Sequence, residues 1–70
     1  MATDNVREQR LRRGWTLDDL ARRCGENGVP TAVSTIGRIE RGVQAPRPRL
    51  RKLLAELLAL DVTDFEKEAS

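Results

Sequence analysis

The sequence contains no histidine and a single cysteine, Cys24, among its 70 residues. One cysteine excludes an intramolecular disulfide, and without a cluster of cysteine and histidine we expect no metal site. The sequence also lacks a glycine-rich phosphate loop and a base or nucleophile at workable spacing, so we expect neither an enzyme nor a cofactor. Cys24 follows other apolar residues at helical spacing, and we expect it in the core, where a free thiol behaves as a small hydrophobe.

Aromatic residues are also scarce, with one tryptophan, one phenylalanine and no tyrosine. This scarcity disfavours the aromatic platforms on which proteins stack single-stranded nucleic acids and RNA. No apolar run approaches the length of a membrane span, and the start MATDNVREQ does not resemble a signal peptide, so we expect a cytoplasmic protein without membrane contact. We expect one small domain over residues 1–70, with an ordered core over about 5–67 and dense leucine packing.

The net charge of +2 is unevenly distributed along the chain. Residues 1–55 hold twelve basic and six acidic side chains, whereas residues 56–70 hold one basic and five acidic side chains. Eleven of the thirteen basic residues are arginine, whose guanidinium makes paired hydrogen bonds to phosphate and guanine. The basic part therefore suits a nucleic-acid partner, although an arginine-rich composition is also typical of proteins from GC-rich genomes.

The central segment of the chain, Thr16 to Gly42, predicts two helices joined by a connector. The first begins at Thr16, because Asp19 follows at the spacing of a capping box and adds negative charge at the positive end of the helix dipole. Gly25 or Gly28 ends this helix, and Pro30 prevents its continuation. Its apolar face recurs at helical spacing and consists of Leu17, Leu20, Ala21 and Cys24.

The second helix of this segment is expected to start at Thr31 or Ala32 and to stop at Gly42. Helical geometry divides its residues between two faces. The inward face consists of Ala32, Ile36 and Ile39, with Glu40 alongside, and the outward face of Val33, Ser34, Gly37, Arg38 and Arg41. A short helix with a polar, small and cationic outer face fits the major groove of DNA.

Helices are also expected on both sides of this segment. The first runs from a cap at Asp4 or Asn5 to about Arg13, and Trp15 then either covers the joint between two helices or lies near DNA. Prolines keep residues 43–48 out of a helix. A fourth helix from Pro48 or Arg49 to Leu58 and a short fifth from Thr63 to Glu68 complete an all-α compact bundle of about five short helices.

From Val6 to Phe65 the chain resembles the Cro and phage-repressor type of helix-turn-helix domain. The residues that carry the resemblance are Arg10, Gly14, Thr16, Leu20–Ala21, Ser34–Ile36, Ile39–Gly42, Pro46, Leu54–Ala55 and Ala59–Thr63. It implies a lambda-repressor-like bundle whose second and third helices form the helix-turn-helix. In one respect the chain departs from the family, since residues 25–31 exceed the usual turn of about three residues by roughly five. The sequence therefore leaves two adjacent residues as possible starts of the recognition helix.

The resemblance implies a transcriptional regulator that binds double-stranded DNA in a sequence-specific way, with repression at an inverted-repeat operator as the expected action. The other interpretation is a protein-interaction module, such as an adaptor or an antitoxin-like partner, that reuses the fold. The basic residues distinguish these two interpretations, because a protein-interaction module does not need a row of cationic side chains on one face. The resemblance also implies a partly buried ion pair between Arg10 and Glu40, although two unrelated solvated charges remain the alternative.

Candidate contacts to DNA follow from this docking mode. We expect the bases to be read by Val33, Ser34 and Arg38, which lie on the outward face of the recognition helix. Val33 suits a thymine methyl group, and Arg38 suits guanine O6 and N7 unless it reaches a phosphate instead. Phosphate contacts are expected from Thr16, Leu17, Thr35, Arg41, Arg47 and Arg49.

A domain this small buries little DNA surface, so we expect a homodimer on DNA, with half-sites about 34 Å apart. The apolar residues near the C-terminal end either mediate self-association or only close the core. They are Leu57, Leu60, Val62 and Phe65.

Overall fold

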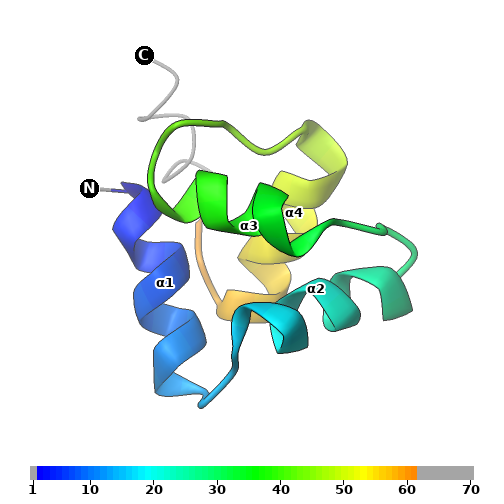
Figure 1. The fold of residues 1–70 in the computed structure, drawn as a ribbon, viewed down its shortest axis with the longest axis horizontal. Coiled ribbons are helices and arrows are strands. Elements are labelled where there is room, and N and C mark those ends of the chain that lie inside the picture. The colour runs from blue at the N-terminus through cyan, green and yellow to red at the C-terminus, as the bar shows by residue number, and fades with distance from the viewer. Residues whose placement is uncertain (1, 62–70) are drawn as a thin grey trace.

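The computed structural model describes residues 2–61, and the side chains among them from Asn5 onward. This part of the chain forms four α-helices and no strand, in keeping with the expected all-α class. Their bounds are α1 Ala2–Arg12, α2 Leu17–Glu26, α3 Val33–Glu40 and α4 Pro48–Leu58. Figure 1 shows α2 and α3 as a pair, with α1 along one side and α4 packed behind them. The expected fifth helix from Thr63 to Glu68, together with Val62 and Phe65, lies outside the described residues.

The start of α2 has the capping box that the sequence predicts. The Thr16 hydroxyl accepts a hydrogen bond from the Asp19 backbone N–H at 3.0 Å, and the Asp19 carboxylate accepts one from the Thr16 N–H at 2.9 Å. At the other end Asn27 caps the helix, and Gly28 adopts a left-handed φ of 82°. Of the two glycines predicted to end this helix, Gly28 does so, and Gly25 lies inside the helix.

Helix α3 is shorter than predicted, and two of its residues were assigned to the wrong face. Ala32, expected to point inward, is exposed because the helix begins at Val33 and leaves Ala32 as its N-cap. Gly37, expected on the outward face, is buried beside Glu40, and a Cβ there would lie 3.5 Å from Nη1 of Arg41. The two errors have different causes: Ala32 lies before the first helical turn, whereas Gly37 is buried because α3 packs against both α1 and α2, so its buried arc is wider than its apolar residues indicate.

The bounds of the outer helices agree with the sequence to different degrees. Helix α4 begins at Pro48, whose fixed φ suits a first helical position, and ends at Leu58 as predicted. Helix α1 instead begins at Ala2, before the predicted caps at Asp4 or Asn5, because neither Ala2 nor Thr3 is a helix breaker. No helix within residues 2–61 is long and apolar enough to cross a membrane.

The core receives side chains from all four helices. The fully buried residues are Val6 from α1, Leu20 and Cys24 from α2, Ile36 and Ile39 from α3, and Leu54 and Leu58 from α4. Each large apolar side chain of this kind contributes about 1.5–3 kcal/mol when it is buried. Packing against one shared core therefore fixes α3 relative to its neighbours, although an isolated helix of 8 residues would not be stable in water.

Candidate nucleic-acid interface

Helix α3 presents an exposed row of side chains on the face that points away from the core. The exposed residues are Val33, Ser34, Arg38 and Arg41, the last of these at the C-cap. Its one acidic residue, Glu40, is 8% exposed and faces inward. The outer face of α3 therefore carries two positive charges and no negative charge, as the sequence predicted.

A hollow of about 460 Å³ lies on the side of α3 that faces α1 and the start of α2. It is lined by Arg7, Arg10, Leu17, Gly37, Glu40 and Arg41. Arg7 is exposed and was not among the residues predicted from the sequence. The signal that could have identified it is its position three residues before Arg10, which places both guanidinium groups on neighbouring positions of α1. The Gly37 surface forms part of the wall because no side chain fills that space.

The buried ion pair between Arg10 and Glu40 lines this hollow. Arg10 Nε lies 2.7 Å from Glu40 Oε2, and Arg10 Nη2 lies 3.2 Å from Oε1, which makes the contact bidentate. Arg10 Nη1 also donates to the Trp15 carbonyl oxygen at 2.7 Å. One guanidinium group thus joins α1, α3 and the turn before α2, and it fixes the start of α2 beside the hollow.

The first turn of α2 presents backbone N–H groups beside this hollow. The N–H groups of Leu17 and Asp18 belong to the first helical turn and have no partner within the helix, whereas those of Asp19 and Leu20 bond to Thr16. The Thr16 hydroxyl accepts a hydrogen bond from the Asp19 N–H and lies beside the Asp19 carboxylate. The hydrogen bonds from the Thr16 backbone and then from its side chain hold the pKa of Asp19 below its ordinary value.

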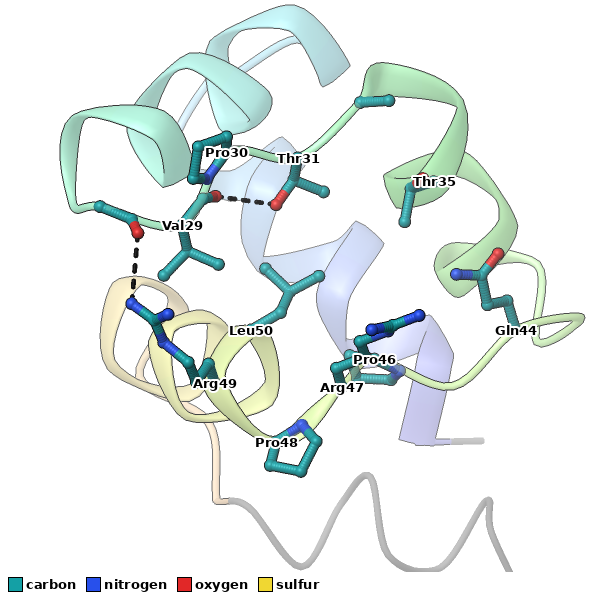
Figure 2. Close-up of a pocket in the computed structure, with 12 residues that line it drawn as sticks. Val29, Pro30, Thr31, Thr35, Gln44, Pro46, Arg47, Pro48, Arg49 and Leu50 are labelled. Carbon is teal, nitrogen blue, oxygen red and sulfur yellow. Dashed lines mark hydrogen bonds between the residues drawn. The ribbon is translucent and has the colours of Figure 1, made fainter.

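A second and larger hollow, of about 730 Å³, lies on the opposite side of α3. Its walls are the long connector between α2 and α3, the loop after α3 and the start of α4, as Figure 2 shows. Thr35 lines it from α3, and Gln44, Arg47 and Arg49 line it from the loop and from α4. Arg49 Nη2 donates to the Gly28 carbonyl oxygen at 3.4 Å, so this side chain also holds the connector against α4. Gln44 was not predicted from the sequence.

The two hollows account for where the predicted phosphate-contacting residues lie. Leu17 and Arg41 line the first hollow, with Thr16 next to Leu17 at the N-cap of α2, and Thr35, Arg47 and Arg49 line the second. The predicted base-contacting residues, Val33, Ser34 and Arg38, are exposed on the outer face of α3 between the two hollows. These three residues are called the ridge of α3 below. Arginines border the ridge on both sides, with Arg7 and Arg41 on one side and Arg47 and Arg49 on the other.

Two residues that the sequence singled out lie away from this surface. Trp15 packs against the core between α1 and α2, and the Arg23 guanidinium lies 4.1 Å from its ring centroid. Of its two predicted roles, Trp15 therefore has the packing role. Cys24 is fully buried, and this burial raises the pKa of its thiol, an effect that a hydrogen bond with Thr31 partly offsets.

A protein-family model described as Helix-turn-helix matches residues 6–65 of the chain. No curated protein and no solved structure matches the chain. The family match begins in α1, continues through α2, the connector and α3, and extends beyond α4. It therefore contains the ridge and both of the hollows that border it.

Proposed function

The chain belongs to the helix-turn-helix family of the Cro and phage-repressor type, and we propose that it represses transcription from an inverted-repeat operator as a dimer. The family makes it a DNA-binding domain of the transcription-regulator type. The operator, the repression and the dimer are our proposals.

The observation that carries the proposal is the ridge of α3 between two hollows bordered by arginine. An α-helix with its side chains is about 10–12 Å across, and the major groove is about 12 Å wide with a phosphate strand on either side. When a helix lies in this groove, the groups on its two flanks face the two strands. The arrangement of Arg7 and Arg41 on one flank, and of Arg47 and Arg49 on the other, suits this geometry.

We assign base reading to the ridge. Val33 and Ser34 lie in the first turn of α3, which this docking mode inserts deepest, and Arg38 follows on the same exposed face. The Arg38 guanidinium can donate two hydrogen bonds to guanine, whereas Ser34 can pair with any base and adds little specificity. Arg38 therefore carries most of the hydrogen-bonded discrimination in this proposal.

We assign phosphate binding to the two flanks. On the first flank the donors are the Leu17 N–H, the Thr16 hydroxyl, Arg41 and Arg7, and on the second they are Thr35, Arg47 and Arg49. About four to six such contacts per half-site predict a log–log salt slope near −4 to −5 per monomer.

A two-fold dimer follows from the small size of the domain, since one copy buries too little DNA for tight specific binding. Leu57 and Leu60 are half-buried on the core and leave part of their surface for a second copy. Half-sites about 34 Å apart would place both copies on one face of the duplex. A dimer that covers an operator blocks other proteins from the same DNA, which is the simplest route to repression.

The proposal is tested by selecting duplexes from a random-sequence pool and measuring their affinity as a function of salt. We expect a steep slope and a selected inverted repeat. Arg38→Ala should lower affinity on the best site by about 1–3 kcal/mol and relax preference at one base pair per half-site. Arg12→Ala is the matched control, because Arg12 is exposed, lines neither hollow and, among the described side chains, forms its ion pair with Glu8.

Two results would contradict the proposal. If no duplex is retained at low salt, DNA binding fails and the protein-interaction module becomes the better interpretation. If Arg38→Ala weakens binding equally on all sequences, Arg38 holds only the backbone, and base reading must lie elsewhere on the ridge.

A further inference from the structure

The tip of α3 and the connector before it form the longest part of the DNA-facing segment without charge. Residues 27–37 contain no charged side chain, although 34% of the whole chain is charged. The exposed residues of this stretch are Asn27 and Gly28 at its start, and Pro30, Ala32, Val33 and Ser34 at the tip of α3. Val33 is 37% exposed and is one of three large apolar side chains with this degree of exposure among the described residues. The part of α3 that enters the groove first is therefore mainly apolar.

The start of α3 is also built without the residues that stabilise helix starts. Ala32 occupies the N-cap, none of the described side chains caps this end, and the first turn holds no acid. Serine, threonine, aspartate and asparagine stabilise this position better than alanine does. Any of them would place a polar group at the tip, whereas alanine keeps the tip small and apolar beside Val33.

An apolar tip can distinguish base pairs in the major groove by one feature only. Each base pair presents hydrogen-bond donors and acceptors there, but an isopropyl group can pair with none of them. The C5-methyl group of thymine is the one apolar group on these edges. Cytosine presents no such group until it is methylated at C5, and 5-methylcytosine then presents a methyl at the same place as thymine.

We propose that Val33 reads the C5-methyl group of a pyrimidine, so that thymine and 5-methylcytosine are accepted alike at one position of each half-site. This inference rests on the proposed DNA binding. Unmethylated cytosine and uracil are disfavoured there, because they leave Val33 against a polar edge without a methyl group to contact. Methylation of cytosine can therefore increase the binding of this protein to a site that otherwise binds it weakly.

The experiment uses the best duplex from a random-sequence selection, resynthesised with each thymine in turn replaced by deoxyuridine. One position per half-site should lose about three- to fivefold in affinity, which corresponds to one buried methyl group. At that position a C·G pair should bind as weakly as the uracil duplex. A 5-methylcytosine pair should bind within about twofold of the thymine duplex.

Two variants assign the effect to Val33. Val33→Ala should make the thymine and uracil duplexes bind equally while leaving the melting temperature nearly unchanged. Val43→Ala is the matched control, because Val43 is 69% exposed but lies in the loop after α3. It should keep the full preference for the methylated pyrimidine.

The outcomes separate this inference from the proposed function. If no duplex binds, DNA binding itself fails. If duplexes bind but uracil is tolerated at every position, or if Val33→Ala keeps the preference, methyl reading is overturned and DNA binding stands.

Discussion

The starts of α2 and α3 differ in how their backbone N–H groups are bonded: side chains cap the first turn of α2, and none among the described residues caps that of α3. Helix α2 starts with Thr16 and Asp19, which bond to each other's backbone N–H groups, and with acidic charge in its first turn. Helix α3 starts with Ala32, without a capping side chain among the described residues and without an acid in its first turn. Thr16 thus stabilises its own helix, whereas Ala32 contributes little to α3.

In our proposal the two helices have different roles: α2 positions the protein on the phosphates, and α3 reads the bases. A capped start is rigid and offers only a few donors in fixed places, which suits a phosphate. An uncapped start with small side chains allows close approach and has no local structure to disturb when it meets a base edge. Local rules for stability are broken where a contact to a partner needs the space, as at other functional sites.

The largest effect is expected from the ion pair that joins α1 to the end of α3, and whose Arg10 also bonds to the turn before α2. Glu40→Ala strands the buried Arg10 charge and should lower the free energy of unfolding by about 3–5 kcal/mol. Glu56→Ala, an exposed acid on α4, is the control and should change stability by less than about 0.5 kcal/mol. Urea unfolding of both variants measures the difference, and equal midpoints would show that the pair does not anchor α3.

Placing a capping side chain at the start of α3 should raise the stability of the fold and lower its affinity for DNA. Ala32→Asp supplies a cap and should raise the free energy of unfolding by about 1 kcal/mol. The same charge faces the DNA and should reduce duplex affinity by at least about tenfold. Ala32→Ser, a neutral cap, should gain stability with a smaller loss of binding. Unchanged affinity in Ala32→Asp would place the start of α3 away from DNA.

Removing the cap of α2 should lower stability, whereas adding a cap to α3 should raise it. Thr16→Ala leaves the Asp19 N–H without its partner and should lower the free energy of unfolding by about 1 kcal/mol. Thr16→Ser restores the hydroxyl and should recover most of this loss. Thermal unfolding of the two variants provides the measurement, and a stable Thr16→Ala would mean that tertiary packing alone fixes α2.

The smallest expected effect concerns pH, and it should be confined to α2. The pKa of Asp19 is lower in the folded protein than in the unfolded chain, so its contribution is complete above the ordinary pKa of aspartate, about 3.9, and is lost as pH falls through the folded value. The stability difference between the wild type and Asp19→Asn should therefore shrink below about pH 4. Chemical denaturation at several pH values tests this, and a constant difference would remove Asp19 as the cause.

Short-range features were determined by the sequence alone. The capping box at Thr16 and the end of α4 at Leu58 depend on residues within a few positions of one another, so local patterns suffice to predict them. The same patterns limited the end of α2 to Gly25 or Gly28 and the start of α4 to Pro48 or Arg49, and the structure has Gly28 and Pro48. The exposure of Val33, Ser34 and Arg38 also followed from the sequence, because Ile36 and Ile39 fix the inward face of α3.

Only the tertiary structure decided what lies on the flanks of α3. Arg7 borders the first hollow because α1 packs beside α3, and these helices are far apart in the chain. The same packing buries Gly37, which helical periodicity had placed outside, and brings Arg10 to Glu40 across 30 residues. The connector is residues 27–32 rather than the predicted 25–31, because Gly25 and Glu26 belong to α2, and it is about three residues longer than the usual turn. Its place was not determined by the sequence, because it depends on Val29 packing against the core and on Arg49 bonding to Gly28. Periodicity reports the apolar face of a helix, but the partners of its other faces depend on how distant helices meet.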